Sequence, residues 1–331
     1  MSKRYLSIQE QMDHLVADKN IDESSLKERY FKEKTYLDLV SPYTDLIAKD
    51  RDKETGDHIY EEKESFQKFL ECGYIDDALS CFLRHAIGSF EKSLKSFLMN
   101  SYCKKMRDAG DTLAMNYEWI ADYKDNKEVL GLMPMNTLLY KGAEVLSLED
   151  DPEVQRRIEA LDEILKRSQE DEPSNLMAKH YRQKYRYIPM FVVIHTLSLN
   201  KLLTLFKMLP VSDRVDFIKF YLDDYKGKTD AKRVCNLEEE FKRLIIIRNI
   251  VNHYEPIFPF ILNYYDHNMQ ELEVTLQRLK NHYERCETKS GLDFRQLQNI
   301  SFKGNSYSNI KIKKVKIILR IFANNASIEG Q

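Results

Sequence analysis

Length, composition and charge restrict the fold before any motif is considered. The chain has 331 residues, which is room for one large domain or two ordinary ones. Glycine and proline number only 10 and 8, while 43% of the residues are hydrophobic. Barrels, sandwiches and glycine-rich phosphate loops need more turn-forming residues than this, so the composition argues against them and predicts a mostly helical protein.

Neither the cysteines nor the apolar segments indicate export, a metal site or a membrane. The five cysteines are scattered and form no C-x-x-C pair, so no zinc site or disulfide framework is predicted. The first residues lack the apolar core of a signal peptide, and the uncharged stretch 187–200 is too short to span a bilayer. We therefore expect a cytoplasmic protein with no metal, no cofactor and no membrane partner.

The charge is unevenly distributed although the net charge is only −2. Residues 1–175 hold 25 Lys and Arg against 37 Asp and Glu, a net −12, and residues 176–331 hold 26 against 16, a net +10. This asymmetry indicates either two halves that attract each other or a basic half that faces a polyanion. The acidic run 169–173 lies at the changeover and is the best candidate for a linker.

Helix signals are frequent in the first half. Ser7 and Glu10 form a capping box that opens the first predicted helix, and a second amphipathic stretch covers 25–40. Residues 48–58 are nearly all polar and predict a surface loop. A proline-free stretch over 75–106 predicts a long helix, near whose start Asp76 and Asp77 are interpreted as helix-end or surface charge. The pattern then breaks over about 108–150, which predicts an irregular insertion.

The second half is more apolar. Pro189 opens a helix that is apolar nearly all round and is predicted to be buried. Asn236, with a glutamate three residues on, is predicted to cap a helix that ends at Pro256. A heptad seam follows, whose partner is either another helix of this chain or a second copy. The seam consists of Leu262, Tyr265, Met269, Leu272, Leu276, Leu279 and Tyr283.

Four polar side chains on one predicted buried helix form the candidate catalytic group of this sequence. The segment LIIIRNIVNHYEP, residues 244–256, is aliphatic apart from Arg248, Asn249, Asn252 and His253 before its last residues. At 100° per residue these four lie within an arc of about 140°, and Ile250 and Val251 lie opposite. An arginine in such surroundings needs a partner, which is either an internal carboxylate or an anion that enters a cleft.

These residue types suit an anionic substrate. Histidine titrates near pH 6.5 and serves as a general acid or base, and arginine offers a planar fork of donors to phosphate. Together they can cleave RNA without metal, because the 2′-hydroxyl attacks the adjacent phosphate while arginine stabilises the developing charge. The alternative is a structural arginine with satisfied amides.

The sequence RNIVNH resembles the R-N-x-x-x-H signature of HEPN ribonucleases. Three further segments resemble Abi-like proteins of the AbiD/AbiF type: YLSIQEQMDHL near the start, SFEKSLK at 89–95 and PMFVVIHTLSLNKLLTLF at 189–206. The four matches follow the family's order over most of residues 5–256. This resemblance implies an abortive-infection protein of phage defence.

The resemblance also implies a fold and a site. It implies a single largely helical chain, an all-α helical bundle with a HEPN-like core over 60–290, preceded by a helical segment 1–60 and followed by a basic segment 291–331. Arg248 would stabilise phosphate charge, His253 would transfer protons and Asn249 would orient one or both. Asn252 and Glu91 would support them, with Glu91 pairing with Arg248 or with Lys95.

HEPN nucleases usually combine two such motifs, so a single copy implies a homodimer. A second loose Arg–His pattern, from Arg51 to His58, lies in the predicted polar loop and is discounted. Some relatives are accompanied by a small noncoding RNA, so a bound regulatory RNA is compatible with this reading. The alternative function is a catalytically inactive RNA-binding or partner-binding module, antitoxin-like or structural.

Two basic stretches of the second half are candidates for RNA contact, since one of them is interleaved with tyrosines that could stack on bases. A solvated basic face is the competing interpretation. The candidate residues are Lys179, Arg182, Lys184, Arg186, Lys311, Lys313, Lys314 and Lys316.

Overall fold

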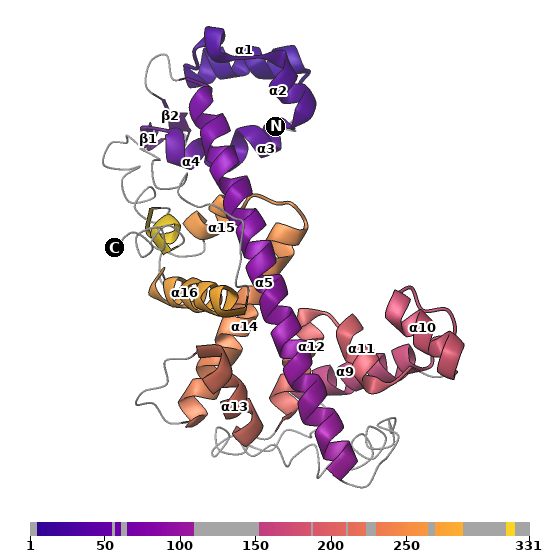
Figure 1. The fold of residues 1–331 in the computed structure, drawn as a ribbon. Coiled ribbons are helices and arrows are strands. Elements are labelled where there is room, and N and C mark those ends of the chain that lie inside the picture. The colour runs from indigo at the N-terminus through magenta and orange to yellow at the C-terminus, as the bar shows by residue number, and fades with distance from the viewer. Residues whose placement is uncertain are drawn as a thin grey trace, which may run out of the picture. The chain divides into compact units, whose positions relative to one another are not determined.

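The computed structural model confirms the all-α prediction (Figure 1). It describes residues 5–54, 57–60, 65–108, 152–186, 188–209, 211–222, 230–263, 269–286 and 316–321. One short antiparallel pair of strands is the only sheet among these residues. The chain divides into two compact units, Met1–Ile87 with Ile246–Gln331, and Gly88–Ile245. The divisions fall inside two long helices, so each of these helices contributes to both units.

The first unit begins with short helical elements and the strand pair, followed by the first turns of a long helix. It continues, after the second unit in sequence, with the end of a second long helix and the helices that follow it. Its elements are α1 (Ile8–Lys19), η1 (Glu23–Ser25), α2 (Glu28–Glu33), α3 (Tyr36–Leu39), η2 (Ser41–Tyr43), α4 (Thr44–Ile47), β1 (Asp50–Arg51), β2 (His58–Ile59), the start of α5 (Gln67–Asp108), the end of α14 (Asp230–Asn252), α15 (Ile257–Asn263) and α16 (Met269–Cys286). The capping box predicted for α1 is present, because Ser7 Oγ accepts from Glu10 N at 3.3 Å and Glu10 Oε2 accepts from Ser7 N at 2.8 Å. Residues 316–321 are also helical.

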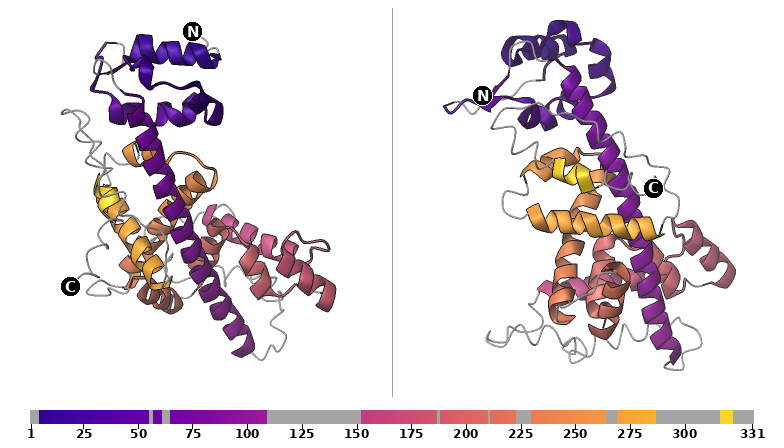
Figure 2. Two further views of the ribbon diagram at one scale, coloured as in Figure 1. Left: turned by 45° about the horizontal axis from the view of Figure 1, so that its top comes forward. Right: turned by 60° about the vertical axis from the view of Figure 1, so that its left-hand side comes forward.

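The core of the first unit is built around the N-terminal half of α5. Phe66 stacks on Phe69 with ring centroids 5.7 Å apart, at the point where the helix begins. Further along, Phe82 meets Tyr283 of α16 edge-on at 5.4 Å, and both views of Figure 2 show α16 beside α5. Burying large aromatic side chains of this kind contributes about 1.5–3 kcal/mol each. Phe31 of α2 also lies 5.5 Å from Phe66, so packing from both sequence ends of the unit fixes the first half of the long helix.

The second unit packs helices around a cluster of aromatic rings. Its elements are the rest of α5 and α14, with α9 (Pro152–Ser168), α10 (Leu176–Tyr185), α11 (Met190–Thr196), α12 (Leu199–Met208) and α13 (Val211–Leu222). Phe90 of α5 lies 5.0 Å from Phe241 of α14 and 4.9 Å from Tyr221 of α13, in edge-to-face geometry. Phe206 of α12 lies 5.1 Å from Phe241, so one cluster joins four helices.

Two predictions for the N-terminal part are wrong in detail. The stretch 25–40 is not one helix, because Thr35 and Asp38 form a capping box that starts α3 afresh. The predicted loop 48–58 contains the pair β1–β2, in which Arg51 lies opposite His58. The hydrophobic pattern revealed neither feature, since an internal cap and a two-residue strand are too short to produce a hydrophobic period of their own.

The predicted helix boundaries of the second half also need correction. The apolar segment after Pro189 forms two helices, α11 and α12, because the chain is extended at Leu197 and Ser198. Asn236 lies inside α14, which begins at Asp230, and so is not a cap. The acidic run 169–173 is a connection between α9 and α10 within the second unit and separates no units.

The heptad seam is partly confirmed. Leu272, Leu276 and Leu279 of α16 are at most 1% exposed, and their neighbour Tyr283 contacts α5, so a helix of this chain covers the seam. α15 ends at Asn263 and α16 begins at Met269, and Tyr265 between them lies outside the described residues. The irregular insertion predicted over about 108–150 also lies outside them, except for Asp108 at the end of α5, and so does the segment 287–315. Within the described ranges, no helix combines the length and apolarity needed to cross a membrane.

Candidate functional site

The polar constellation predicted from the sequence lies at the C-terminal end of α14, in the first unit. Arg248, Asn249 and Asn252 occupy the last turns of the helix, and His253 is the first residue beyond it. Arg248 is half-buried and its Nη1 donates to Asn249 Oδ1 at 3.4 Å, while Asn249, Asn252 and His253 are exposed. The structure therefore brings the four residues to one helix end, where three of the four side chains are exposed.

The turn after the helix holds His253 in place. The backbone N–H of His253 donates to the Asn249 carbonyl at 3.0 Å, and that of Glu255 reaches back to the Ile250 carbonyl at 3.1 Å. Between them Tyr254 has φ 59°, a left-handed conformation that helix ends usually assign to glycine. The chain thus leaves α14 in a hydrogen-bonded turn, and this turn fixes the backbone conformation at His253.

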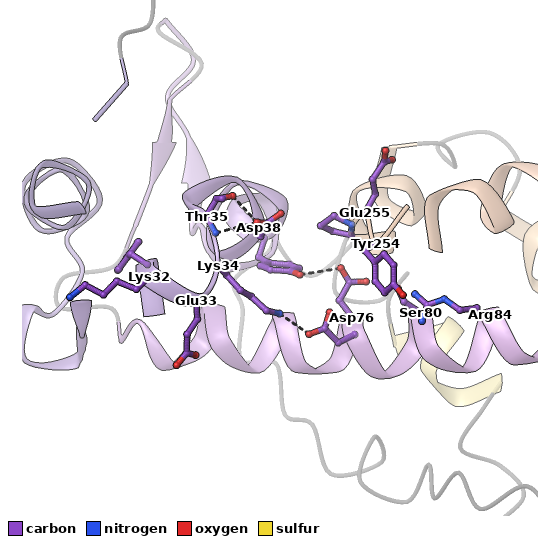
Figure 3. Close-up of a pocket in the computed structure, with 14 residues that line it drawn as sticks. Lys32, Glu33, Lys34, Thr35, Asp38, Asp76, Ser80, Arg84, Tyr254 and Glu255 are labelled. Atoms are coloured by element: carbon purple, nitrogen blue, oxygen red, sulfur yellow. Dashed lines mark hydrogen bonds and ion pairs between the residues drawn. The ribbon is translucent and has the colours of Figure 1, made fainter. Parts of the chain in front are cut away.

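Arg84 of α5 ties this turn to the long helix. Its Nε donates to the Val251 carbonyl at 3.2 Å and its Nη2 donates to the same oxygen. Carbonyls in the last turn of a helix have no partner within the helix, so a cationic donor is favourable there. The guanidinium also lies 4.5 Å from the centre of the Tyr254 ring. Figure 3 shows Tyr254 beside Ser80 and Arg84 of α5.

Asp76 fixes the chain on the other side of the turn. Its Oδ1 accepts from Ile257 N at 3.0 Å and from Phe258 N at 3.2 Å, so it caps α15, and its Oδ2 accepts from the Tyr43 hydroxyl at 3.1 Å. The carboxyl is 1% exposed, and this burial raises its pKa to about 7. The interpretation of Asp76 as a helix-end or surface charge is wrong, whereas Asp77 is exposed and pairs with Lys34 at 2.8 Å.

A pocket of about 640 Å³ opens next to the turn. Tyr254, Glu255 and Pro256 line it from the end of the motif, and Ser80 and Arg84 line it from α5. The end of α2 and the residues that follow it complete its wall (Figure 3). All of its lining residues belong to the first unit. The motif therefore ends at the rim of a cavity that the sequence did not predict.

The supporting residues predicted elsewhere are engaged in local contacts. Glu91 and Lys95 of α5 form an i,i+4 pair at 4.0 Å in the second unit, with each side chain 16% exposed. A pairing of Glu91 with Arg248 stays a prediction. On α10, Arg182 pairs with Asp171 and donates to the Arg186 carbonyl at 2.9 Å, so it stabilises the helix end.

The remaining basic candidates differ in position. Lys179, Lys184 and Arg186 are exposed on or next to α10, where Tyr181 and Tyr185 lie 5.4 Å apart, and RNA contact there stays a prediction. Lys316 is half-buried at the start of the helical residues 316–321. Lys311, Lys313 and Lys314 lie outside the described residues.

The discounted Arg51–His58 pattern forms a real contact in the structure. Asp45 Oδ1 accepts from Arg51 Nη2 at 3.2 Å and lies 2.7 Å from His58 Nε2. Both partners of the strand pair are thus held by one carboxylate from α4. This cluster ties the strand pair to the short helices, which is a structural role. In the parts of the chain that the structure describes, no group of three or more His, Cys, Asp or Glu side chains is arranged to hold a metal ion.

Sequence reasoning missed three residues of this site: Asp76, Arg84 and Tyr254. Asp76 and Arg84 lie on α5, far from the motif in sequence, and nothing in the spacing of α5 connects them to it. For Tyr254 the sequence did offer one indication. The residue follows a helix end and precedes Pro256 by two positions, where a left-handed backbone conformation is common.

The fold and this site define an all-α protein in which helix α14 ends in an Arg–Asn–His group, with the arginine half-buried and the other two residues exposed. Comparison with known families then gives the particular family: the chain belongs to the Abi-like proteins, whose family model matches residues 29–259. The match covers more than half of the chain and includes the motif at the end of α14. Searches of curated proteins and of solved structures found no significant match.

Proposed function

We propose that this chain is a metal-independent endoribonuclease of the HEPN type that acts in abortive infection. Membership of the Abi-like family suggests abortive-infection defence against phage. The observation that carries the ribonuclease proposal is the helix end itself, where half-buried Arg248 contacts Asn249 and His253 stands exposed on a backbone held by Asn249. These are the groups that RNA cleavage by internal attack requires.

The chemistry follows from these groups. The 2′-hydroxyl oxygen of the substrate attacks the adjacent phosphorus and loses its proton to a general base, while the bond to the 5′-oxygen breaks and that oxygen takes up a proton. His253 is the proton-transfer group, and Arg248 stabilises the negative charge that grows on the phosphate oxygens. Asn249 orients Arg248 through the 3.4 Å contact, and Asn252 lies one turn beyond Arg248 on the same helix.

A homodimer completes the proposed site. One histidine cannot be base and acid at once within a single cleavage step, whereas two copies of the motif supply both. The exposure of His253 and Asn249 leaves these side chains available to a second chain. A bound small noncoding RNA is a further part of the proposal, and the exposed basic residues of α10 are its candidate contacts.

The test is RNA cleavage in EDTA by the purified chain and by matched variants. Arg248→Ala and His253→Ala are each expected to lower the rate by about 10²-fold or more, since general acid–base and charge stabilisation each contribute on this scale. His14→Ala, on the N-terminal helix α1, is the matched control and should cleave at the wild-type rate. Cleavage by His253→Ala at the wild-type rate contradicts the proposal.

The alternative function is a binding module with an inactive site, and cell growth separates it from the nuclease. If the chain is a nuclease, expression of the triggered wild type is toxic and both Arg248→Ala and His253→Ala relieve the toxicity. If it is a binding module, Arg248→Ala leaves the phenotype unchanged. A structural, antitoxin-like partner predicts in addition that no nucleic acid co-purifies.

A further inference from the structure

Tyr254 follows His253 in the sequence and has no role in the proposed chemistry, yet its side chain is largely exposed to solvent. Tyr254 is 81% exposed and keeps φ 59°, which costs a non-glycine residue about 1–2 kcal/mol. A bulky aromatic residue is uncommon in this region of φ, and such backbone strain is found most often at functional sites. The turn therefore holds a large aromatic ring in solvent, directly beside the predicted proton-transfer group.

The guanidinium of Arg84 packs against one face of the Tyr254 ring. It lies 4.5 Å from the ring centre and is itself anchored by two hydrogen bonds to the Val251 carbonyl. A planar cation against one face of an aromatic ring is favourable, and here the cation is fixed to the helix that carries the motif. Because the ring remains 81% exposed, a second planar group can stack on it.

The neighbouring pocket has the wrong charge for a phosphate but suits a nucleobase. Its volume of about 640 Å³ lies within the usual range for small-molecule sites. Three cationic side chains line it against four exposed acidic ones, besides the buried Asp76, so a phosphate is disfavoured there. Carboxylates accept hydrogen bonds from the N–H groups on base edges. The lining charged residues are Lys32, Lys34 and Arg84, with Glu33, Asp38, Asp76, Asp77 and Glu255.

We propose that Tyr254 is a nucleobase-stacking residue, which holds the base of a nucleotide that flanks the cleaved phosphate at the mouth of this pocket. Arg84 is its positioning residue, since it supports the ring and ties the turn to α5. The substrate class that follows is single-stranded RNA, because only an unpaired base can leave its neighbours and stack on a side chain. This inference rests on the proposed ribonuclease function.

The test measures binding without cleavage. A short fluorescein-labelled single-stranded 2′-O-methyl RNA has no 2′-hydroxyl to attack, so its Kd by fluorescence anisotropy does not depend on catalysis. Base stacking on an aromatic side chain predicts that Tyr254→Ala binds about 5- to 150-fold more weakly. Tyr254→Phe keeps the ring and should stay within about twofold. Tyr74→Ala removes another exposed tyrosine of the same unit, outside the pocket, and is the matched control.

An abasic scan identifies the contact itself. Oligonucleotides that lack one base at a time should include a position that weakens binding to the wild type but not to Tyr254→Ala. Arg84→Ala should weaken binding of the intact oligonucleotide and leave binding of that abasic one unchanged, which loss of structure alone would not produce. Thermal unfolding of each variant confirms that it is folded.

Three results would overturn the inference: wild-type affinity in Tyr254→Ala, an equal abasic penalty in both proteins, or no binding of the oligonucleotide by the wild type. Its failure is separable from that of the ribonuclease proposal, because cleavage by His253→Ala is measured with ordinary RNA. Undiminished cleavage there removes the proposed nuclease site, whatever the anisotropy of the methylated RNA shows.

Discussion

The buried carboxyl of Asp76 gives the sharpest prediction for stability. It caps α15 through Ile257 N and Phe258 N and accepts from Tyr43, with only 1% of its surface exposed. Asp76→Ala leaves two buried N–H groups and a hydroxyl without their acceptor. At about 1–3 kcal/mol for each unsatisfied buried group, the free energy of unfolding should fall by about 3 kcal/mol or more. Asp76→Asn keeps a carbonyl oxygen for the N–H groups and should cost about 1 kcal/mol at pH 5.

The pH dependence of this effect has a definite sign. Burial raises the pKa of Asp76 from 3.8 to about 7, so between these values the folded chain keeps a proton that the unfolded chain has released. The free energy of unfolding therefore falls as the pH rises through this window, by about 2–3 kcal/mol between pH 5 and pH 8. Asp76→Asn lacks this loss, so by pH 8 it should be at least as stable as the wild type.

Urea unfolding at pH 5 and pH 8 measures the difference between the wild type and Asp76→Asn at each pH. Asp77→Asn is the matched control, because its exposed pair with Lys34 is worth less than about 1 kcal/mol at either pH. A difference between wild type and Asp76→Asn that is the same at both pH values would refute the account of the raised pKa. Equal losses for the Ala and Asn variants would refute the capping role.

Three further predictions concern packing and backbone, and each is read from chemical or thermal unfolding. Leu276→Ala should lower the free energy of unfolding by about 2–5 kcal/mol, because this side chain is buried within the chain. Val274→Ala, at a residue 45% exposed on the same helix, should change it by no more than about 0.5 kcal/mol. Similar losses in the two variants would contradict the burial of the seam against this chain. Tyr254→Gly should be about 1 kcal/mol more stable than Tyr254→Ala, since both lose the ring and only glycine accepts φ 59° without strain. Ser7→Ala should cost about 0.5–2 kcal/mol through loss of the capping box, and an unchanged midpoint would contradict this.

The helical character of the chain was readable from its sequence because the signals are local. The scarcity of glycine and proline, the Ser7 capping box and the proline-free stretch around α5 each report on a few neighbouring residues. The boundaries were less readable. Asn236 has the pattern of a cap but lies inside α14, and the extended backbone at Ser198 divides a segment that is apolar throughout. In both cases the local residue pattern did not report where the helix begins or ends.

The site was readable only in part, for a similar reason. Arg248, Asn249, Asn252 and His253 lie within six residues, so helical geometry alone places them together. Asp76 and Arg84 reach the same turn from α5, at a separation of more than 160 residues, and no periodicity in the sequence reports such a contact. The contacts of Asp76 and Arg84 with this turn could therefore be identified only from the structure.

The measurement that tests the central claim most directly is the chemistry of the product ends. RNA is incubated with the wild-type chain in EDTA, and the fragments are analysed by mass spectrometry beside those from His253→Ala. The account predicts 2′,3′-cyclic phosphates and 5′-hydroxyls from the wild type and about 10²-fold slower fragment formation, or none, from the variant. Fragments that carry 5′-phosphates, or cleavage by His253→Ala at the wild-type rate, would contradict it.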